Sequence, residues 1–299
     1  MAIVDPHWPR ADVWLAREHH DPVLTVVGVP SSKASLSPSR ADMAPLVMRE
    51  RLGRFSTFHG ETGVDFGSLP VRDVGNWPVS ELTMEEIPVE VRRLAERLDR
   101  GVLTLYLGGD NAITRPLVAA LGDPERVGVL TFDAHHDVRS LERGPTNGTP
   151  IRGLIEEEGL PGSNVVQVGL HSFANSAAYR AWCGEQGIGV FTMADVDARG
   201  IDAVVEDALS RLSHCERIYV DVDVDVLDSA FAPGCPGARP GGMTVRDLSR
   251  AVHRCAAHPA VVAMDFVEVD PERDPSGRTV DVMAHLFLTA AAGLAQRLG

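Results

Sequence analysis

Two short stretches of the sequence contain most of the side chains that could bind a metal ion. The first, DAHHD at residues 133–137, follows an apolar run, and the second, DVDVDVLD, covers residues 221–228. Two carboxylates and two imidazoles within five residues are costly to bury unless something pairs with them. Because neither stretch contains Lys or Arg, the partner that the sequence predicts is a metal cation.

Side-chain alternation along an extended chain would bring these groups to one face. On this pattern Asp133, His135 and Asp137 point together, as do Asp223 and Asp225. Carboxylate oxygens combined with one imidazole suit Mn²⁺ or a similar divalent ion. Four carboxylates can bridge as well as cap, which favours two ions about 3.5–4 Å apart that activate a water for hydrolysis.

The surrounding sequence predicts the elements that must position these groups. Continuous apolar runs predict buried strands at residues 22–30, 102–110, 127–132, 164–170, 188–192, 217–224 and 260–269. Helical spacing of apolar residues predicts helices at residues 87–101, from about 112, and at 150–158, 176–186, 201–213, 244–257 and 280–298. Buried strands that alternate with helices indicate a three-layer α/β/α fold with a parallel sheet. No domain break is visible, so we expect one domain over residues 1–299.

In open α/β sheets, ligands bind beyond the carboxyl ends of the strands. Four polar motifs follow predicted strands in this way: GGDN (108–111), DAHHD (133–137), DVDVDVLD (221–228) and VEVDP (267–271). We therefore expect one shared site at this edge of the sheet. The Ser- and Pro-rich segment 30–45 is expected to be a loop near it.

Composition and charge exclude several classes of protein. A net charge of −14 argues against nucleic-acid partners and anionic membrane surfaces, and any anionic substrate needs local cations. No apolar run of about 18 residues and no secretory leader is visible, so we expect a cytoplasmic protein without membrane association. The four cysteines are widely spaced, which favours ordinary reduced thiols.

The motifs taken together resemble the ureohydrolase superfamily, which includes arginase, agmatinase and formimidoylglutamase. The resemblance runs from GVP at 28–30 to VEVDP and includes LGGDN, FDAHHDVR, NGTPIR, DVDVLD and APGCPGARPGG. It implies a mainly parallel eight-stranded sheet, two Mn²⁺ ions per subunit, and hydrolysis of amidino or guanidino C–N bonds. It also implies a small-molecule substrate and a homo-oligomer, a trimer or a hexamer.

The resemblance assigns roles to individual residues. Asp133 and Asp223 would bridge both ions, His135 and Asp225 would complete one, and Asp137 would join the other. Asn111 stands where the family usually has a histidine ligand of that second ion, and an amide oxygen is a weaker ligand. His136 is expected to face away from the site. Glu268 aligns with the glutamate that faces the guanidinium or amidine group, and a proton from the region of Asp225 would assist departure of the amine.

A second departure from the family, together with one arginine, narrows the substrate. Asn147 stands where arginases and agmatinases often have a histidine that is a candidate proton shuttle. GGDN, DAHHDVR and GPTNGTP together look most like bacterial formimidoylglutamases. Arg139 lies where arginase has a substrate-contacting asparagine, and an arginine there can form a bidentate pair with a carboxylate. Four residues are therefore candidates for substrate binding: Arg139, Asn147, Thr149 and His171.

The resulting hypothesis is hydrolysis of N-formimidoyl-L-glutamate to L-glutamate and formamide, a step of histidine degradation. One alternative is an agmatinase or another guanidino-acid ureohydrolase. A second is a catalytically silent metal-binding homologue, which the asparagines at 111 and 147 suggest. A metal-dependent deacylase is a weaker option, because the downstream DVDVLD and EVDP motifs do not fit it.

Overall fold

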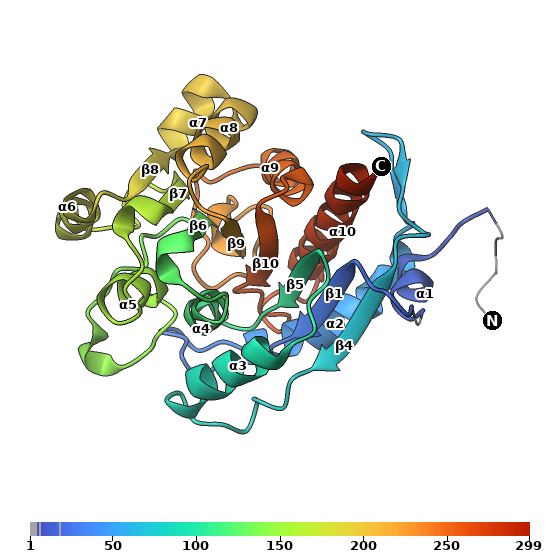
Figure 1. The fold of residues 1–299 in the computed structure, drawn as a ribbon, viewed down its shortest axis with the longest axis horizontal. Coiled ribbons are helices and arrows are strands. Elements are labelled where there is room, and N and C mark those ends of the chain that lie inside the picture. The colour runs from blue at the N-terminus through green and yellow to red at the C-terminus, as the bar shows by residue number, and fades with distance from the viewer. Residues whose placement is uncertain (1–4, 6, 18) are drawn as a thin grey trace.

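The structure is a computed structural model that describes residues 5, 7–17 and 19–299. Its centre is an eight-stranded sheet in which every neighbouring pair of strands is parallel (Figure 1). In spatial order the strands are β4 (Val71–Asn76), β1 (Leu24–Gly28), β5 (Leu103–Leu107), β10 (Val261–Val267), β9 (Arg217–Asp223), β6 (Val127–Phe132), β7 (Val165–Leu170) and β8 (Gly189–Thr192). The predicted parallel α/β fold with eight strands is confirmed.

Helices cover both faces of this sheet, and each face has its own apolar core (Figure 1). One face packs against α1 (Ala11–Leu15), α2 (Ala44–Arg51), α7 (Met193–Arg199), α8 (Ile201–Arg211), α9 (Val245–Ala257) and α10 (Arg278–Leu298). The other packs against α3 (Glu86–Arg97), α4 (Thr114–Ala119), α5 (Pro150–Glu156) and α6 (Ala177–Gln186). The three layers therefore match the predicted α/β/α architecture.

The sequence explains why these elements form. In β1, β5, β6 and β7 every residue is buried, as expected for strands covered on both faces. Helix α9 buries Leu248, Ala251, Val252, Cys255 and Ala256 on one stripe, the spacing of an amphipathic helix. Its N-cap Thr244 accepts a hydrogen bond from the Asp247 amide.

Strand β4 and a small hairpin were not among the predicted elements. β4, with the sequence VRDVGN, lies at the edge of the sheet, and only its first residue is fully buried. The hairpin pairs β2 (Phe58–His59) with β3 (Val64–Asp65) outside the main sheet. Within the described part of the chain, no helix has both the length and the apolar character needed to cross a membrane.

The strand order places the polar motifs next to one another. β5, β10, β9 and β6 are consecutive neighbours at the centre of the sheet. Because all four run in the same direction, their carboxyl ends meet at one edge. These four strands are followed or ended by GGDN, VEVDP, DVDVDVLD and DAHHD, respectively. The four polar motifs therefore meet at one edge of the sheet, as expected.

Candidate active site

The carboxyl edge of the four central strands carries a buried acidic cluster. Asp133 follows β6, Asp223 ends β9, and Glu268 follows β10. Asp225 lies in a short 3-10 turn, Val224–Val226, whose backbone is held by a hydrogen bond from the Asp225 amide to Asp223 Oδ1 (2.8 Å). Alternation along an extended strand was therefore the wrong reason for expecting Asp223 and Asp225 together, since a turn brings the second carboxylate back to the site.

The same correction applies to the first motif. Residues 133–140 form no strand, and Asp137 has a left-handed backbone with φ 53°. Among the described residues that are not glycine, only Phe173 and Glu268 share this positive φ. Left-handed backbone is unfavourable for L-residues and concentrates at functional sites. Two of the predicted site residues, Asp137 and Glu268, are held in this backbone conformation.

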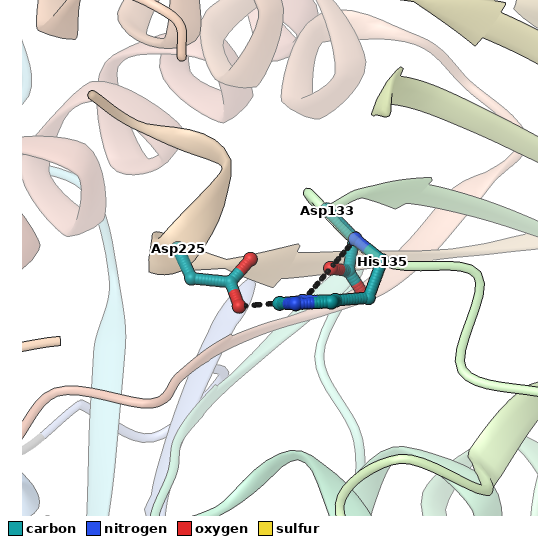
Figure 2. A group of neighbouring side chains, drawn as sticks. All are labelled: Asp133, His135 and Asp225. Atoms are coloured by element: carbon teal, nitrogen blue, oxygen red, sulfur yellow. Dashed lines mark hydrogen bonds and ion pairs between the residues drawn. The ribbon is translucent and has the colours of Figure 1, made fainter. Parts of the chain in front are cut away.

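His135 lies between two of the carboxylates (Figure 2). Its Nδ1 is 2.8 Å from Asp225 Oδ2 and 3.5 Å from Asp133 Oδ1, and its backbone amide donates to Asp133 Oδ1 at 2.6 Å. Burial opposes protonation of the imidazole, but the charge of Asp225 and hydrogen bonds to both carboxylates raise the pKa of His135 to about 11. The cluster thus attracts a positive charge strongly.

The donor set fits divalent metal ions. Ligand atoms of Asp133, His135 and Asp225 all lie within 4.8 Å of one another, and no other such group of three occurs among the described residues. Asp223 and Asp137 face the same cavity. Hard carboxylate oxygens with one imidazole are ligands that Mn²⁺ accepts. Five of the six residues predicted as metal ligands are thus grouped here, and their donor atoms fit such ions.

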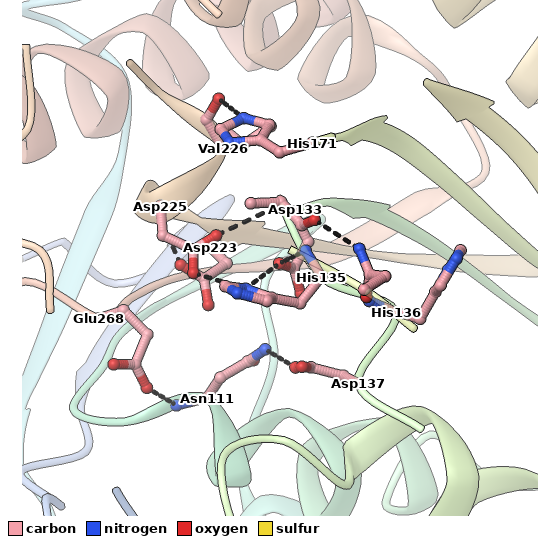
Figure 3. Close-up of polar contacts among 12 residues, drawn as sticks. Asn111, Asp133, His135, His136, Asp137, His171, Asp223, Asp225, Val226 and Glu268 are labelled. Atoms are coloured by element: carbon pink, nitrogen blue, oxygen red, sulfur yellow. Dashed lines mark hydrogen bonds and ion pairs between the residues drawn. The ribbon is translucent and has the colours of Figure 1, made fainter. Parts of the chain in front are cut away.

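Asn111, the departure from the family pattern, lies beside this cluster (Figure 3). Its side-chain Nδ2 donates to Asp137 Oδ2 at 2.7 Å, and its backbone amide donates to Glu268 Oε1 at 2.8 Å. In this arrangement the amide nitrogen of Asn111, and not its oxygen, faces Asp137. Asn111 is completely buried, so these contacts are shielded from water.

Glu268 is a buried carboxylate without a cationic partner among the described residues. It accepts hydrogen bonds from the Asn111 amide and from Asn147 Nδ2, the latter at 3.0 Å. Burial, reinforced by the charge of Asp110, raises the pKa of Glu268 to about 8. A group in this state gains from any cation that enters the cavity, such as an amidinium.

A cavity of about 150 Å³ opens from the acidic cluster to solvent. Its walls include two exposed arginines, Arg139 and Arg239, and neither guanidinium has an ion-pair or hydrogen-bond partner among the described residues. Two glycines make room for this arrangement. A Cβ at Gly148 would lie 2.6 Å from Arg139 Cδ, and one at Gly237 would lie 2.2 Å from Asp225 Oδ2. Other lining residues are Leu36, Ser37, Asn175 and Tyr179. The predicted loop at 30–45 therefore reaches the site with its first part, whereas residues 41–45 are helical, in a 3-10 turn and the start of α2.

The four residues expected to bind substrate separate into two pairs. Arg139 and Asn147 line the cavity. Thr149 and His171 are buried and are not among the residues that line it, so their contact with substrate stays a prediction. The Thr149 hydroxyl donates to the Thr146 carbonyl at 2.8 Å, and His171 Nε2 lies 2.9 Å from the Val226 carbonyl.

His136 points away from the site, as predicted. Its Nδ1 is 2.6 Å from Gln167 Oε1, and its carbonyl accepts a hydrogen bond from Gln167 Nε2. The side chain thereby fixes the loop at residues 133–137 to β7 and does not line the cavity.

Sequence reasoning missed two residues, Asp110 and Asn175, that hold the loops around the site in place. Asp110 Oδ2 accepts hydrogen bonds from the Ala34 amide (3.0 Å) and the Ser31 hydroxyl (3.3 Å), which fixes the loop at residues 31–37. Asn175 connects to the loop at residues 133–137, because its Oδ1 accepts from the His136 amide and its Nδ2 donates to the Ala134 carbonyl. Their motifs, GGDN and GLHSFANS, were visible, but a bond to a distant backbone group leaves no spacing pattern.

Comparison with known proteins agrees with this site. Residues 23–293 match the model of the arginase family. A formimidoylglutamase of Halalkalibacterium halodurans is 39% identical over 275 residues, which cover 90% of this chain and 86% of the relative. The crystal structure of formimidoylglutamase from Bacillus subtilis superposes with a TM-score of 0.92 at 32% identity and covers 99% of this chain and 94% of that one.

A third relative carries metal. The crystal structure of Trypanosoma cruzi formiminoglutamase with Mn²⁺ has a TM-score of 0.89 at 25% identity, covering 97% of this chain and 99% of that one. With the family model matched over nearly the whole sequence and the acidic cluster in place, the chain belongs to the arginase family.

Proposed function

We propose that this chain is a metal-dependent hydrolase that converts N-formimidoyl-L-glutamate and water to L-glutamate and formamide. The observation that carries the proposal is the pairing of a buried acidic cluster at the cavity floor with two unpaired arginines on its exposed wall. The substrate has a cationic amidine end and two carboxylates, so its charges complement both parts of the cavity. Relatives named formimidoylglutamase support this choice.

Five residues would hold two Mn²⁺ ions: Asp133, His135, Asp137, Asp223 and Asp225. Four of them line the cavity, and ligand atoms of Asp133 lie within 4.8 Å of those of His135 and Asp225. The formiminoglutamase structure with Mn²⁺ adds support. When bound, such a pair of ions supplies the Lewis acidity that makes water a nucleophile at neutral pH. Asn111, the sixth predicted ligand, presents its amide nitrogen to Asp137 in this arrangement.

The residues of the chain orient the substrate at both ends. Glu268 would accept the amidine N–H groups, held in place for this by the Asn111 amide and Asn147. Arg139 and Arg239 would each take one carboxylate, since a guanidinium can bind a carboxylate through two parallel hydrogen bonds. Arg152 is not assigned this task, because its guanidinium is engaged with Glu156 and the Val138 carbonyl.

The reaction then requires one bond made and one broken. Water adds to the formimidoyl carbon, and the bond from that carbon to the glutamate nitrogen breaks with its electron pair on nitrogen. A proton must reach that nitrogen as it leaves. We propose that it comes from the side of Asp225, whose Oδ2 lies 2.8 Å from His135 Nδ1, so that the released glutamate carries an ordinary amine.

A substrate panel tests the proposal. With Mn²⁺ present, we expect formamide release from formimidoylglutamate, and activity on agmatine or arginine with none on formimidoylglutamate would reject the assignment. Arg139→Asn should raise KM for formimidoylglutamate by at least about tenfold, the loss expected for a charge-assisted hydrogen bond. Arg143→Asn, a change at an exposed arginine outside the cavity, is the matched control.

Three predictions from the sequence extend the proposal. We propose a cytoplasmic location, assembly into a homo-oligomer (a trimer or a hexamer), and a single domain over residues 1–299. The continuous eight-stranded sheet supports the last of these. Size-exclusion chromatography with light scattering would test the assembly.

A further inference from the structure

Thr114, the first residue of α4, lies behind Asn111 and has two hydrogen-bond acceptors for one proton. Its Oγ1 is 2.7 Å from Asn111 Oδ1 and also 2.7 Å from Asp265 Oδ2. The side chain is completely buried, so no bulk water competes for either bond. Because a hydroxyl has a single hydrogen, Thr114 donates to one of these oxygens at a time.

Asp265 does not depend on Thr114 for a donor. Its Oδ2 also accepts from the Tyr219 hydroxyl at 2.7 Å, and its Oδ1 accepts from the Val222 amide at 3.3 Å. The Thr114 proton is therefore available to Asn111, and this choice fixes the orientation of the amide. With Oδ1 facing Thr114, the amide nitrogen faces Asp137 (Figure 3).

The opposite choice reverses the amide and keeps the number of hydrogen bonds, since the bond from Asn111 Nδ2 to Asp137 is exchanged for one to Thr114. If Thr114 donates to Asp265, its oxygen can accept from Asn111 Nδ2, and Asn111 Oδ1 then faces Asp137. The Asn111 backbone stays in place, because its amide donates to Glu268 at 2.8 Å. An amide oxygen facing a carboxylate is repulsive unless a cation lies nearby. The second arrangement therefore suits a loaded metal site, and the first suits an empty one.

We propose that Thr114 is a positioning residue whose hydroxyl selects which end of the Asn111 amide faces Asp137. This inference rests on the proposed metal-dependent function and concerns the half of the site where the family usually has a histidine. A histidine at position 111 would need no such partner. The asparagine needs a neighbour that can both donate and accept, and a hydroxyl does both.

The experiment measures binding of Mn²⁺ alone, without substrate, to metal-free protein by calorimetry and by electron paramagnetic resonance. Wild type and Thr114→Ser, which keeps the hydroxyl, should each bind two ions. In Thr114→Val, the first ion should bind as in wild type and the second about tenfold more weakly, as expected for one lost hydrogen bond. Excess Mn²⁺ should restore kcat of Thr114→Val, while KM stays unchanged.

Two controls separate this role from loss of a buried hydroxyl. Thr289→Val removes another buried hydroxyl, bonded to the His285 carbonyl, and should leave both ions bound as before. The second control uses protein that carries Asn111→Asp, in which residue 111 has no amide to reverse. There, adding Thr114→Ala should not weaken binding of the second ion. The comparison of Asn111→Asp with and without Thr114→Ala also tests the inference if Thr114→Val does not fold. Equal weakening in both backgrounds would overturn the inference.

Two results separate the positioning role of Thr114 from the proposed metal-dependent function. If wild type binds two ions and Thr114→Val binds them identically, the positioning role is wrong and the proposed function stands. If wild type binds no Mn²⁺, the proposed function fails and this inference fails with it.

Discussion

Glu268 shows how the sequence and the fold combine at one residue. The chain holds its backbone in the left-handed region, with φ 64°, and directs two donors, the Asn111 amide and Asn147 Nδ2, at the same oxygen, Oε1. The second carboxylate oxygen has no hydrogen-bond donor among the described residues. A strained backbone that presents a buried, half-satisfied carboxylate to a cavity is consistent with binding a cationic ligand.

Glu268→Gln should lower kcat/KM for formimidoylglutamate by about 30-fold or more. The substitution keeps the shape and one acceptor oxygen but removes the charge that faces the amidine, and breaking a buried charge pair costs about 2 kcal/mol or more. Steady-state assays of formamide release check this. Glu142→Gln, at an exposed glutamate, should leave kcat/KM unchanged. Equal activity of the Glu268 variant and wild type would show that another group holds the amidine.

At the scale of single elements, the strands were predictable where both faces are buried. β1, β5, β6 and β7 have uninterrupted apolar sequences because helices cover both sides of them. β4 escaped prediction because an edge strand needs neither apolar faces nor a second neighbour. VRDVGN was therefore indistinguishable from a loop, although Val71 and its neighbours pair in register with β1.

The site was predictable in composition but not in backbone geometry. The residue types in DAHHD and DVDVDVLD predicted a cluster of metal-binding side chains, since few other roles justify such a density of buried acids, and the structure does bring these side chains together. The left-handed Asp137 and the 3-10 turn at Asp225 have no local signature in sequence. They depend on tertiary contacts, such as the bond from Asn111 to Asp137, made by residues far along the chain.

The β2–β3 hairpin lies outside the main sheet and contacts α9 through a pair of stacked histidines. The ring of His59 stacks on that of His253 with centroids 5.1 Å apart and planes inclined by 17°. His253 Nε2 is buried without a hydrogen-bond partner among the described residues. Burial, and then the proximity of His59, lowers the pKa of His253, while Glu61 opposes this shift. His285 of α10 shows the same lowering, from the same causes.

Acidification should therefore loosen the hairpin. Because the pKa of His253 is lower in the folded protein than the value of about 6.5 in an unfolded chain, the unfolded form takes up more protons below that pH, and stability falls as the pH decreases through 6.5. Hydrogen-exchange protection of residues 58–65, corrected for intrinsic rates, should decrease between pH 7.5 and 5.5, by up to about tenfold at the lower pH.

A variant without the titratable imidazole of His253 provides the control for this prediction. His253→Phe keeps an aromatic ring against His59 and should remove much of the pH dependence at residues 58–65. His20→Phe, at an exposed histidine outside the hairpin contact, should leave it in place. Protection that falls equally in His253→Phe and wild type would assign the effect to other groups.

At the scale of the whole molecule, the buried acids at the centre of the sheet and the arginines of the cavity wall have different electrostatic effects. The chain carries a net charge of −14, and its most concentrated buried acids lie at the centre of the sheet. A diacid substrate meets long-range repulsion from such a protein, which the two arginines on the cavity wall counter locally. The same acids repel one another unless cations bind among them.

Removal of the metal should consequently destabilise the entire fold. Burial, and then the charge of Asp225, raises the pKa of Asp133 to about 6, above the value of about 3.9 for a free aspartate. The folded metal-free protein therefore loses stability as the pH rises from about 4 to 6, and at pH 7.5 the whole cost is present. An ion at 100 times its Kd returns about 2.7 kcal/mol, or about 5 °C in Tm for a chain of this size.

Thermal unfolding at pH 7.5, with chelator and then with Mn²⁺, measures this difference, and elemental analysis should find two ions per chain. Asp133→Asn removes one of the repelling charges together with a predicted bridging ligand. Its metal-free form should melt at or above the Tm of metal-free wild type, yet Mn²⁺ should no longer raise that Tm. Asp207→Asn, at a surface aspartate paired with Arg199 and Arg211, should keep the full Mn²⁺ response. If Mn²⁺ stabilised wild type and Asp133→Asn equally, the ions would bind elsewhere, and the acidic cluster would need another explanation.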